Sequence, residues 1–388
     1  MAHDQGSPAP DSKHESDGAE PTPHLERRGS AFLNFFSSFL GSKNPLAKAA
    51  DPHQHTVWLY DNTAYQPVVE GDNSPSSSWQ AEVVACIFEK DGRKDAGKWI
   101  AAIADHIGLD GEMGRDKEAH ERIKQRVQPF LDQVSPAKTL TVEAKVNGAL
   151  QTHPIGPSDR NGIISQIIDL GAGGVQDGTI RCPEGWMVIS DIDDTIKRTM
   201  TMETTGILRT TFAEEPLPIA GMPEFYRHVQ AELNPAWFYL SASPYNLYPF
   251  LHSFLHEHYA LGTLILRDYS WMDVGGFIRS FTEKTQEYKV DRMEKIHRWF
   301  PLRRVLCIGD STQKDPEAYA EIYQRYPGWI HAIAIRKVTN VSNMEEKNKP
   351  ERFEEAFKDV PSDVWTVFED PSELYDFVDG LGMEDQDF

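Results

Sequence analysis

Three aspartates lie within four positions of one another at the end of an apolar stretch. They are Asp191, Asp193 and Asp194 in WMVISDIDDTIK, residues 186–197. Burying unpaired carboxylates so close together costs several kcal/mol for each charge. A cation that binds carboxylate oxygens removes that cost. The stretch therefore predicts a site for chemistry rather than an ordinary strand end.

Further polar side chains follow later apolar stretches. Asp310 and Asp315 lie in IGDSTQKD, Ser241 and Ser243 in YLSASP, and Lys289 in EYKVDR. Facing carboxylates raise one another's pKa unless a cation lies between them. Mg²⁺ suits such a site because it binds few carboxylates and keeps waters and phosphate oxygens as its other ligands. A hydroxyl and an ammonium nearby can hold a phosphoryl group, so this set of residues predicts phosphoryl transfer.

Strands that alternate with helices from about residue 184 would bring these groups together. Such an alternation forms a doubly wound parallel sheet, whose site lies beyond the carboxyl ends of the strands. In that topology the first and fourth strands are neighbours, so Asp191 and Asp310 would face each other across one crevice. The strands are expected at 186–191, 236–243, 262–269, 303–311 and 329–338.

The motifs resemble those of the haloacid dehalogenase superfamily. DIDDT fits its first motif, D-x-D-x-T, and Ser241, Lys289 and GDSTQKD match its second, third and fourth motifs in order. The stretches SDIDDTIK, YLSASPYNLYPFL and CIGDSTQKDPEAYAEI are similar to the catalytic domain of the fungal actin-patch phosphatidate phosphatase family. The resemblance covers roughly residues 55–340 and implies a haloacid-dehalogenase-like Rossmannoid α/β domain, preceded by a smaller mixed, β-rich domain.

The resemblance also implies a role for the matched residues. Asp191 would be the nucleophile that forms an aspartyl-phosphate, and Asp193 the general acid and then the general base. Mg²⁺ would be bound by Asp191, the backbone carbonyl of Asp193, and Asp310. Asp315 would support the cation or Lys289.

Several nearby residues would support this site. Thr195 would brace the loop, and Asp194 would either support the site or cap the following turn. Ser243 stays an alternative to Ser241 as the hydroxyl of the second motif. Lys197 and Arg198 could contact an anionic head group or could simply be solvated.

The substrate implied by the resemblance is phosphatidate, which would give diacylglycerol and phosphate. Diacylglycerol pyrophosphate and lysophosphatidate are related substrates. Residues 196–235 are too few for a large cap, so we expect a small cap or none and an open crevice. Two alternatives remain: a phosphatase of soluble phosphomonoesters or phosphoproteins, and an adaptor that binds endocytic proteins at actin patches. The family implies a cytoplasmic location, peripheral to the membrane at the cortical actin patch.

Composition excludes some classes of function. The formal net charge of −21 argues against nucleic-acid binding, because phosphates would be repelled. The three separated cysteines favour a reducing compartment. No apolar stretch approaches the roughly 20 residues that span a bilayer. Membrane contact would therefore be peripheral.

The rest of the chain shows changes in composition that suggest domains. The phenylalanines of residues 31–40 would share one face of a helix, which could insert into a membrane interface, dock on the protein or act in targeting. Residues 362–381 are expected to form a helix that packs on the body, or a segment that binds a partner. The predicted regions are 1–30 disordered, 31–50 amphipathic helix and linker, 51–178 β-rich domain, 179–342 catalytic domain and 343–388 acidic segment.

Overall fold

The computed structural model describes most of the chain from residue 47 to residue 383. The predicted disorder of residues 1–30 and the amphipathic helix at 31–40 lie outside the described residues. None of the helices in the described part is long and apolar enough to cross a bilayer. The described ranges are 47–69, 74–90, 97–108, 117–172, 183–268, 277–279, 281, 283–339 and 341–383.

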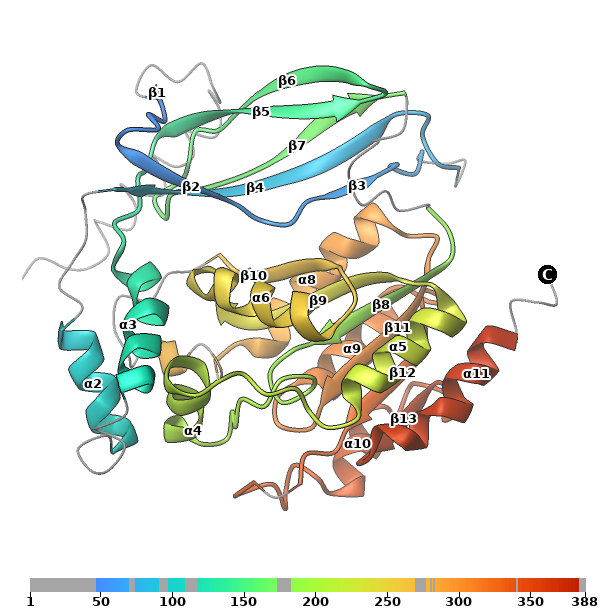
Figure 1. The fold of residues 1–388 in the computed structure, drawn as a ribbon. Helices are drawn as coiled ribbons and strands as arrows, with labels where there is room; N and C mark the ends of the chain where they lie inside the picture. Colours follow the sequence, from blue (N-terminus) through green and yellow to red (C-terminus); the bar gives the residue numbers. More distant parts are fainter. Residues whose placement is uncertain are drawn as a thin grey trace, which may run out of the picture.

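A six-stranded parallel sheet forms the centre of the C-terminal part (Figure 1). The chain moves outward from β8 to β10 and then returns to place β11 beside β8, so the strand order reverses at that point. This confirms the α/β class and the five predicted strands. The order is β10 (Thr263–Arg267), β9 (Ala236–Pro244), β8 (Trp186–Asp191), β11 (Arg304–Asp310), β12 (Ile330–Arg336) and β13 (Trp365–Phe368).

Helices cover both faces of this sheet. Successive side chains of a strand point to opposite faces, so Val188 joins one apolar cluster while Met187 and Ile189 join the other. Burial on both faces explains why the strands are continuously apolar. The first cluster includes residues of α5 (Met222–Leu233), α6 (Tyr248–His258) and α11 (Tyr375–Met383), and the second includes residues of α8 (Thr285–Trp299), α9 (Asp315–Arg325) and α10 (Pro350–Ala356).

The C-terminal segment differs from the expected single helix over 362–381. Its WTVF stretch forms β13, which pairs in parallel with β12, because β-branched and aromatic residues suit a pleated, half-buried edge. A 3₁₀ turn at Pro371–Leu374 follows, with a capping box formed by Asp370 and Glu373. The expected docking helix is therefore the shorter α11, which packs against α5.

The N-terminal part consists mainly of antiparallel strands in two sheets. Apolar side chains between the sheets form a separate core. Asn147 and Gly148 both have positive φ and make a two-residue hairpin turn. One sheet contains β2 (His55–Leu59), β3 (Thr63–Tyr65), β4 (Trp79–Glu89) and β7 (Ile163–Gly171), and the other contains β1 (Lys48–Ala49), β5 (Lys138–Val146) and β6 (Ala149–Ile155).

Two helices of this N-terminal part contact the segment that connects β8 to α5. Helix α2 (Gly97–Ile107) contacts α4 (Thr204–Leu208), and helix α3 (Lys117–Leu131) contacts the π-helical turn η3 (Arg209–Ala213). Figure 1 shows α2, α3 and α4 together at one edge of the molecule. The segment expected to form a small cap or none is thus packed against helices of the N-terminal part.

Phe130 of α3 lies at the centre of this contact and gives a test of it. It is 4% exposed, and its ring centroid lies 5.5 Å from that of Trp99, 5.8 Å from Phe212 and 5.7 Å from Phe277. We expect Phe130→Ala to lower the free energy of unfolding by about 3–5 kcal/mol. The exposed Leu150 is the control, and Leu150→Ala should change the free energy of unfolding by less than about 0.5 kcal/mol. Equal denaturation midpoints for the two variants would contradict this packing.

Candidate active site

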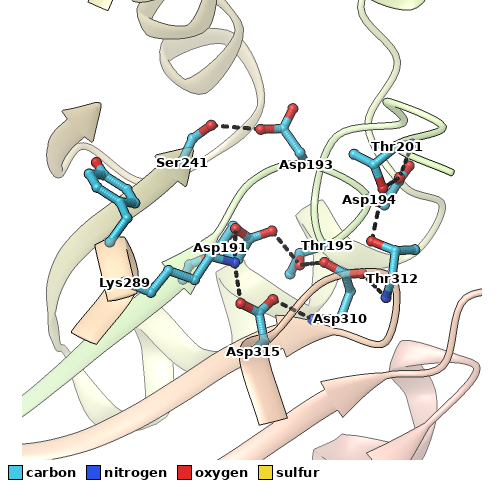
Figure 2. A network of polar contacts seen from close by, with 12 residues as sticks. Asp191, Asp193, Asp194, Thr195, Thr201, Ser241, Lys289, Asp310, Thr312 and Asp315 are labelled. Carbon is cyan, nitrogen blue, oxygen red and sulfur yellow. Dashed lines mark hydrogen bonds and ion pairs between the residues drawn. The ribbon is translucent and has the colours of Figure 1, made fainter. Parts of the chain in front are cut away.

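The carboxylates of Asp191 and Asp310 meet at the carboxyl ends of neighbouring strands. Asp191 ends β8 and Asp310 ends β11. The Thr195 hydroxyl lies between them, 2.9 Å from Asp191 Oδ2 and 3.2 Å from Asp310 Oδ2 (Figure 2). The structure thus brings together the two acids that we expected to face each other, and Thr195 braces both.

Lys289 connects Asp191 to a third carboxylate. It lies in α8, is fully buried, and donates from Nζ to Asp191 Oδ1 at 2.6 Å and to Asp315 Oδ1. Asp315 is the first residue of α9, and its other oxygen accepts the backbone N–H of Asp310 at 3.0 Å. Asp315 therefore fixes both the lysine and the end of β11, as Figure 2 shows.

Burial of these charges shifts their pKa values. Burial raises the pKa of Asp191 well above its usual range, and the neighbouring carboxylates raise it further against the opposing effect of Lys289. Burial and Asp315 raise the pKa of Asp310 to about 7. Burial alone would lower the pKa of Lys289, but the attraction of the three acids outweighs it and raises that pKa. Lys289 stays an ammonium, and its single charge does not offset the carboxylates in their ionised form, so these groups hold protons more tightly than usual.

The uncompensated charge makes this cluster suitable for a divalent cation. Asp191, Asp310 and Asp315 each offer a carboxylate oxygen, and these oxygens lie within 4.8 Å of one another. An all-oxygen, acidic donor set is what Mg²⁺ prefers. Asp191 and Asp310 end neighbouring strands and both contact the Thr195 hydroxyl, so we regard them as the better candidates for direct ligands.

The carboxylate of Asp193 is held by hydroxyl groups. It accepts hydrogen bonds from Ser241 at 2.6 Å, Thr199 at 2.8 Å and Ser243 at 3.3 Å. The Nζ atom of Lys197 lies 3.6 Å from Asp193 Oδ1, and this lysine is only 1% exposed. In this structure Lys197 and both serines are thus directed at Asp193, with Ser241 the closer of the two serines.

Asp194 shapes the loop after β8. Its backbone has φ of 62°, and its carboxylate accepts the backbone N–H groups of Thr199, Met200 and Thr201. The Thr201 hydroxyl also donates to Asp194 and lies 2.9 Å from Thr312 Oγ1, a contact that joins this loop to the one after β11. Asp194 thus caps the loop, one of the two supporting roles expected for it.

The site is more enclosed than we expected. Asp191, Asp193 and Asp310 are at most 2% exposed, whereas we expected an open crevice. The sequence does not show that the segment after β8 packs against α2 and α3, since those helices belong to a different predicted region. Arg198, considered with Lys197 as a contact for an anionic group, lies exposed at the surface.

Gly309 is required by the close approach of Asp315, and this gives a test of the site geometry. A Cβ atom at Gly309 would lie 2.7 Å from Cβ and Oδ2 of Asp315. We expect Gly309→Ala to displace Asp315 and to lower the free energy of unfolding by about 1–3 kcal/mol.

Gly380 provides the matched control, because a Cβ there meets nothing within 4 Å. Gly380→Ala should leave the unfolding midpoint unchanged or raise it slightly, since alanine favours helix. Chemical denaturation measures the free energy of unfolding of both variants. A Gly309→Ala variant as stable as Gly380→Ala would show that Asp315 is not held against β11.

Comparison with known sequences agrees with this geometry. Residues 186–337 match the family described as "Phosphatidate phosphatase APP1, catalytic domain". Phosphatidate phosphatase APP1 of Saccharomyces cerevisiae is 30% identical over 161 residues, which are 41% of this chain and 27% of that protein. An uncharacterized protein of Schizosaccharomyces pombe is 30% identical over 159 residues, which are 40% of this chain and 25% of that protein. The match therefore spans about a quarter of the length of these relatives.

The matched region contains the structural elements that form the site. It begins with β8 and ends just after β12, and so includes Asp191, Lys289, Asp310 and Asp315. The N-terminal sheets and helices α2 and α3 lie outside it. Residues 186–337 are therefore similar to the catalytic domain of the APP1 phosphatidate phosphatase family.

Proposed function

We propose that this chain is a Mg²⁺-dependent phosphatidate phosphatase with a haloacid-dehalogenase-like catalytic domain. It would hydrolyse phosphatidate to diacylglycerol and phosphate through an aspartyl-phosphate on Asp191. The observation that carries the proposal is the buried carboxylate of Asp191, oriented by Lys289 on one oxygen and Thr195 on the other. It lies in a domain whose family is named for this activity.

The first step transfers the phosphoryl group to the protein. A carboxylate oxygen of Asp191 attacks phosphorus, and the bond between phosphorus and the glycerol oxygen breaks. Asp193 gives its proton to that oxygen, which leaves as the hydroxyl of diacylglycerol. Lys289 and Thr195 fix the orientation of Asp191, which lowers the entropic cost of reaching the reactive geometry.

The second step releases phosphate. Asp193, now a carboxylate, takes a proton from water as the water oxygen attacks phosphorus. The bond between phosphorus and Asp191 breaks, which releases phosphate and restores both side chains to their starting states. Ser241 donates to Asp193 in this structure. A phosphoryl oxygen can accept that hydrogen bond instead, so substrate binding would free Asp193 to reach the leaving oxygen.

Asp191, Asp310 and the backbone carbonyl of Asp193 would hold Mg²⁺, with Asp315 in support. When bound, the ion would supply positive charge that offsets the carboxylates and the phosphoryl oxygens. The raised pKa of Asp310, about 7, indicates that the cluster lacks such charge when no cation is present. Metal binding at this site should therefore compete with protons.

A phosphatase of soluble phosphomonoesters or phosphoproteins is the second candidate. The enclosed site favours it, because a small phosphomonoester needs less opening than a lipid with two acyl chains. The adaptor function, the location at cortical actin patches with endocytic partners, and peripheral membrane contact through residues 31–40 stay predictions from the sequence.

Phosphate release from phosphatidate in detergent micelles tests the proposed activity. We expect release with Mg²⁺, loss of release with EDTA, and a fall of at least about a thousandfold for Asp191→Asn, which removes the nucleophile. Asp291→Asn, on the exposed side of α8, is the control and should act as wild type. Release from small phosphomonoesters but not from phosphatidate would favour the second candidate. Undiminished release by Asp191→Asn would overturn the mechanism.

The pKa of Asp310 predicts how stability depends on pH and Mg²⁺. Its folded pKa of about 7 lies above the usual aspartate pKa of 3.8, so the folded state binds the proton more tightly than the unfolded state does. Without Mg²⁺, stability should therefore fall as pH rises from about 4 through about 7. Bound Mg²⁺ replaces the proton. Mg²⁺ should then raise the Tm more at pH 8 than at pH 5.5.

Asp310→Asn provides the control for this pH dependence. The variant should lose most of the Mg²⁺-dependent rise in Tm, because it lacks one of the charged ligands. Differential scanning fluorimetry across pH measures both effects. A rise in Tm that is equal at the two pH values, or equal in the variant, would contradict the assignment of Asp310 as a ligand.

A further inference from the structure

An arginine of the N-terminal part forms hydrogen bonds to the backbone of the segment between β8 and α5. Arg126 of α3 donates from Nη1 to the backbone carbonyls of Thr211 at 3.0 Å and Glu214 at 2.6 Å. Its Nη2 lies 3.8 Å from the Glu215 carboxylate, and its side chain is 12% exposed. These carbonyls lie at the end of η3, where a helix leaves carbonyl groups without donors of its own. Arg126 thus completes the hydrogen bonds of this turn.

A second arginine, one helical turn away, forms hydrogen bonds to the same segment. Arg122 donates from Nε to the carbonyl of Ala213 at 2.6 Å and from Nη1 to Glu215 at 3.1 Å. Positions four residues apart lie on the same face of a helix. Helix α3 therefore presents two guanidinium groups to one short turn.

The turn η3, which both arginines contact, is close enough to form a hydrogen bond with the loop that holds Asp193. The hydroxyl of Thr210, in η3, lies 2.9 Å from the backbone carbonyl oxygen of Thr199 and 2.9 Å from that of Gly206, so either carbonyl can accept its proton. The Thr199 hydroxyl in turn donates to Asp193 Oδ1 at 2.8 Å. A shift of η3 would therefore move the group that orients the Asp193 carboxylate.

A second route leads from Arg126 to Asp193 through Phe250 of α6. The guanidinium carbon of Arg126 lies 4.4 Å from the Phe250 ring centroid, and Lys197 Nζ lies 5.8 Å from that centroid. Both distances are within the range of cation–π attraction. Lys197 Nζ donates to Thr199 Oγ1 at 2.6 Å and lies 3.6 Å from Asp193. Both routes thus end at Thr199 and Asp193.

We propose that Arg126 is a positioning residue that lets the N-terminal part of the chain orient the general acid, Asp193. The proposal rests on the proposed function, since it takes Asp193 to be the proton donor. Arg126 lies outside residues 186–337, so the family match does not assign it a role. The catalytic domain would then depend on helix α3 for efficient proton transfer.

The dependence of rate on the leaving group tests this proposal. A misplaced proton donor slows the loss of an alcohol, which needs a proton, more than the loss of a nitrophenol, which leaves readily as an anion. We expect Arg126→Met to lower kcat/KM for an alkyl phosphate at least about tenfold more than for p-nitrophenyl phosphate. Arg126→Lys should retain an intermediate rate, because a lysine cannot reproduce the forked contact.

Lys124→Met is the matched control, since Lys124 lies on the exposed side of the same helix. It should leave both rates unchanged. An equal fall for the two esters in Arg126→Met would mean a merely structural role and would overturn the proposal, as would no fall in either. If Arg126→Met does not fold, Arg126→Lys carries the same comparison.

Amide hydrogen exchange keeps the test independent of the proposed activity. The backbone N–H groups of Thr199, Met200 and Thr201 are bonded to Asp194, so their exchange reports the order of this loop. We expect faster exchange there in Arg126→Met and Arg126→Lys, but not in Lys124→Met. If wild type hydrolyses neither ester, the proposed function fails while this measurement still decides whether Arg126 holds the loop. Unchanged exchange would overturn that role.

Discussion

The contact of the Lys289 ammonium with Asp191 and Asp315 is the interaction on which the rest of the site depends. Each of these three side chains is at most 1% exposed, so none of the charges is stabilised by bulk water. Removing one partner of such a buried group leaves an uncompensated charge and is strongly destabilising. One lysine does not balance the acids around it, and the raised pKa values of Asp191 and Asp310 express that excess. This imbalance supports the proposal that a cation binds here, and the cation would in turn offset the negative charge of a phosphoryl group.

The fold holds these buried charges in place because each one lies on a helix or strand of the sheet domain. Asp191 and Asp310 end adjacent parallel strands, Lys289 lies in the helix before β11, and Asp315 begins the helix after it. The absence of a side chain at Gly309 lets Asp315 approach the strand. The carboxylate of Asp193, by contrast, is held by hydroxyl groups, including those of Thr199 and Ser241. Helix α3 stabilises the segment that carries those contacts.

Much of this arrangement could be predicted from the sequence, because strand patterns and motif order report local structure. Asp191, Lys289, Asp310 and Asp315 each follow or begin an element whose apolar pattern is clear. The hydroxyls of Thr199, Thr201 and Thr312 were not predicted, since isolated threonines carry no spacing signal. The strand β13 was missed because it is short and lies within an acidic stretch that suggests a helix. The burial of the site and the packing of α3 against η3 were also missed, since contacts between segments distant in sequence leave no local pattern.

Mapping the covalent intermediate is the measurement that tests the central claim most directly. Wild-type protein would be mixed with phosphatidate and Mg²⁺, quenched in acid within the first turnover, and analysed by peptide mass spectrometry. The account predicts a phosphoryl group on Asp191, in the peptide that contains residues 186–197, and its absence from Asp191→Asn. Turnover accompanied by a phosphoryl group on a different residue, or turnover that persists in Asp191→Asn, would contradict it.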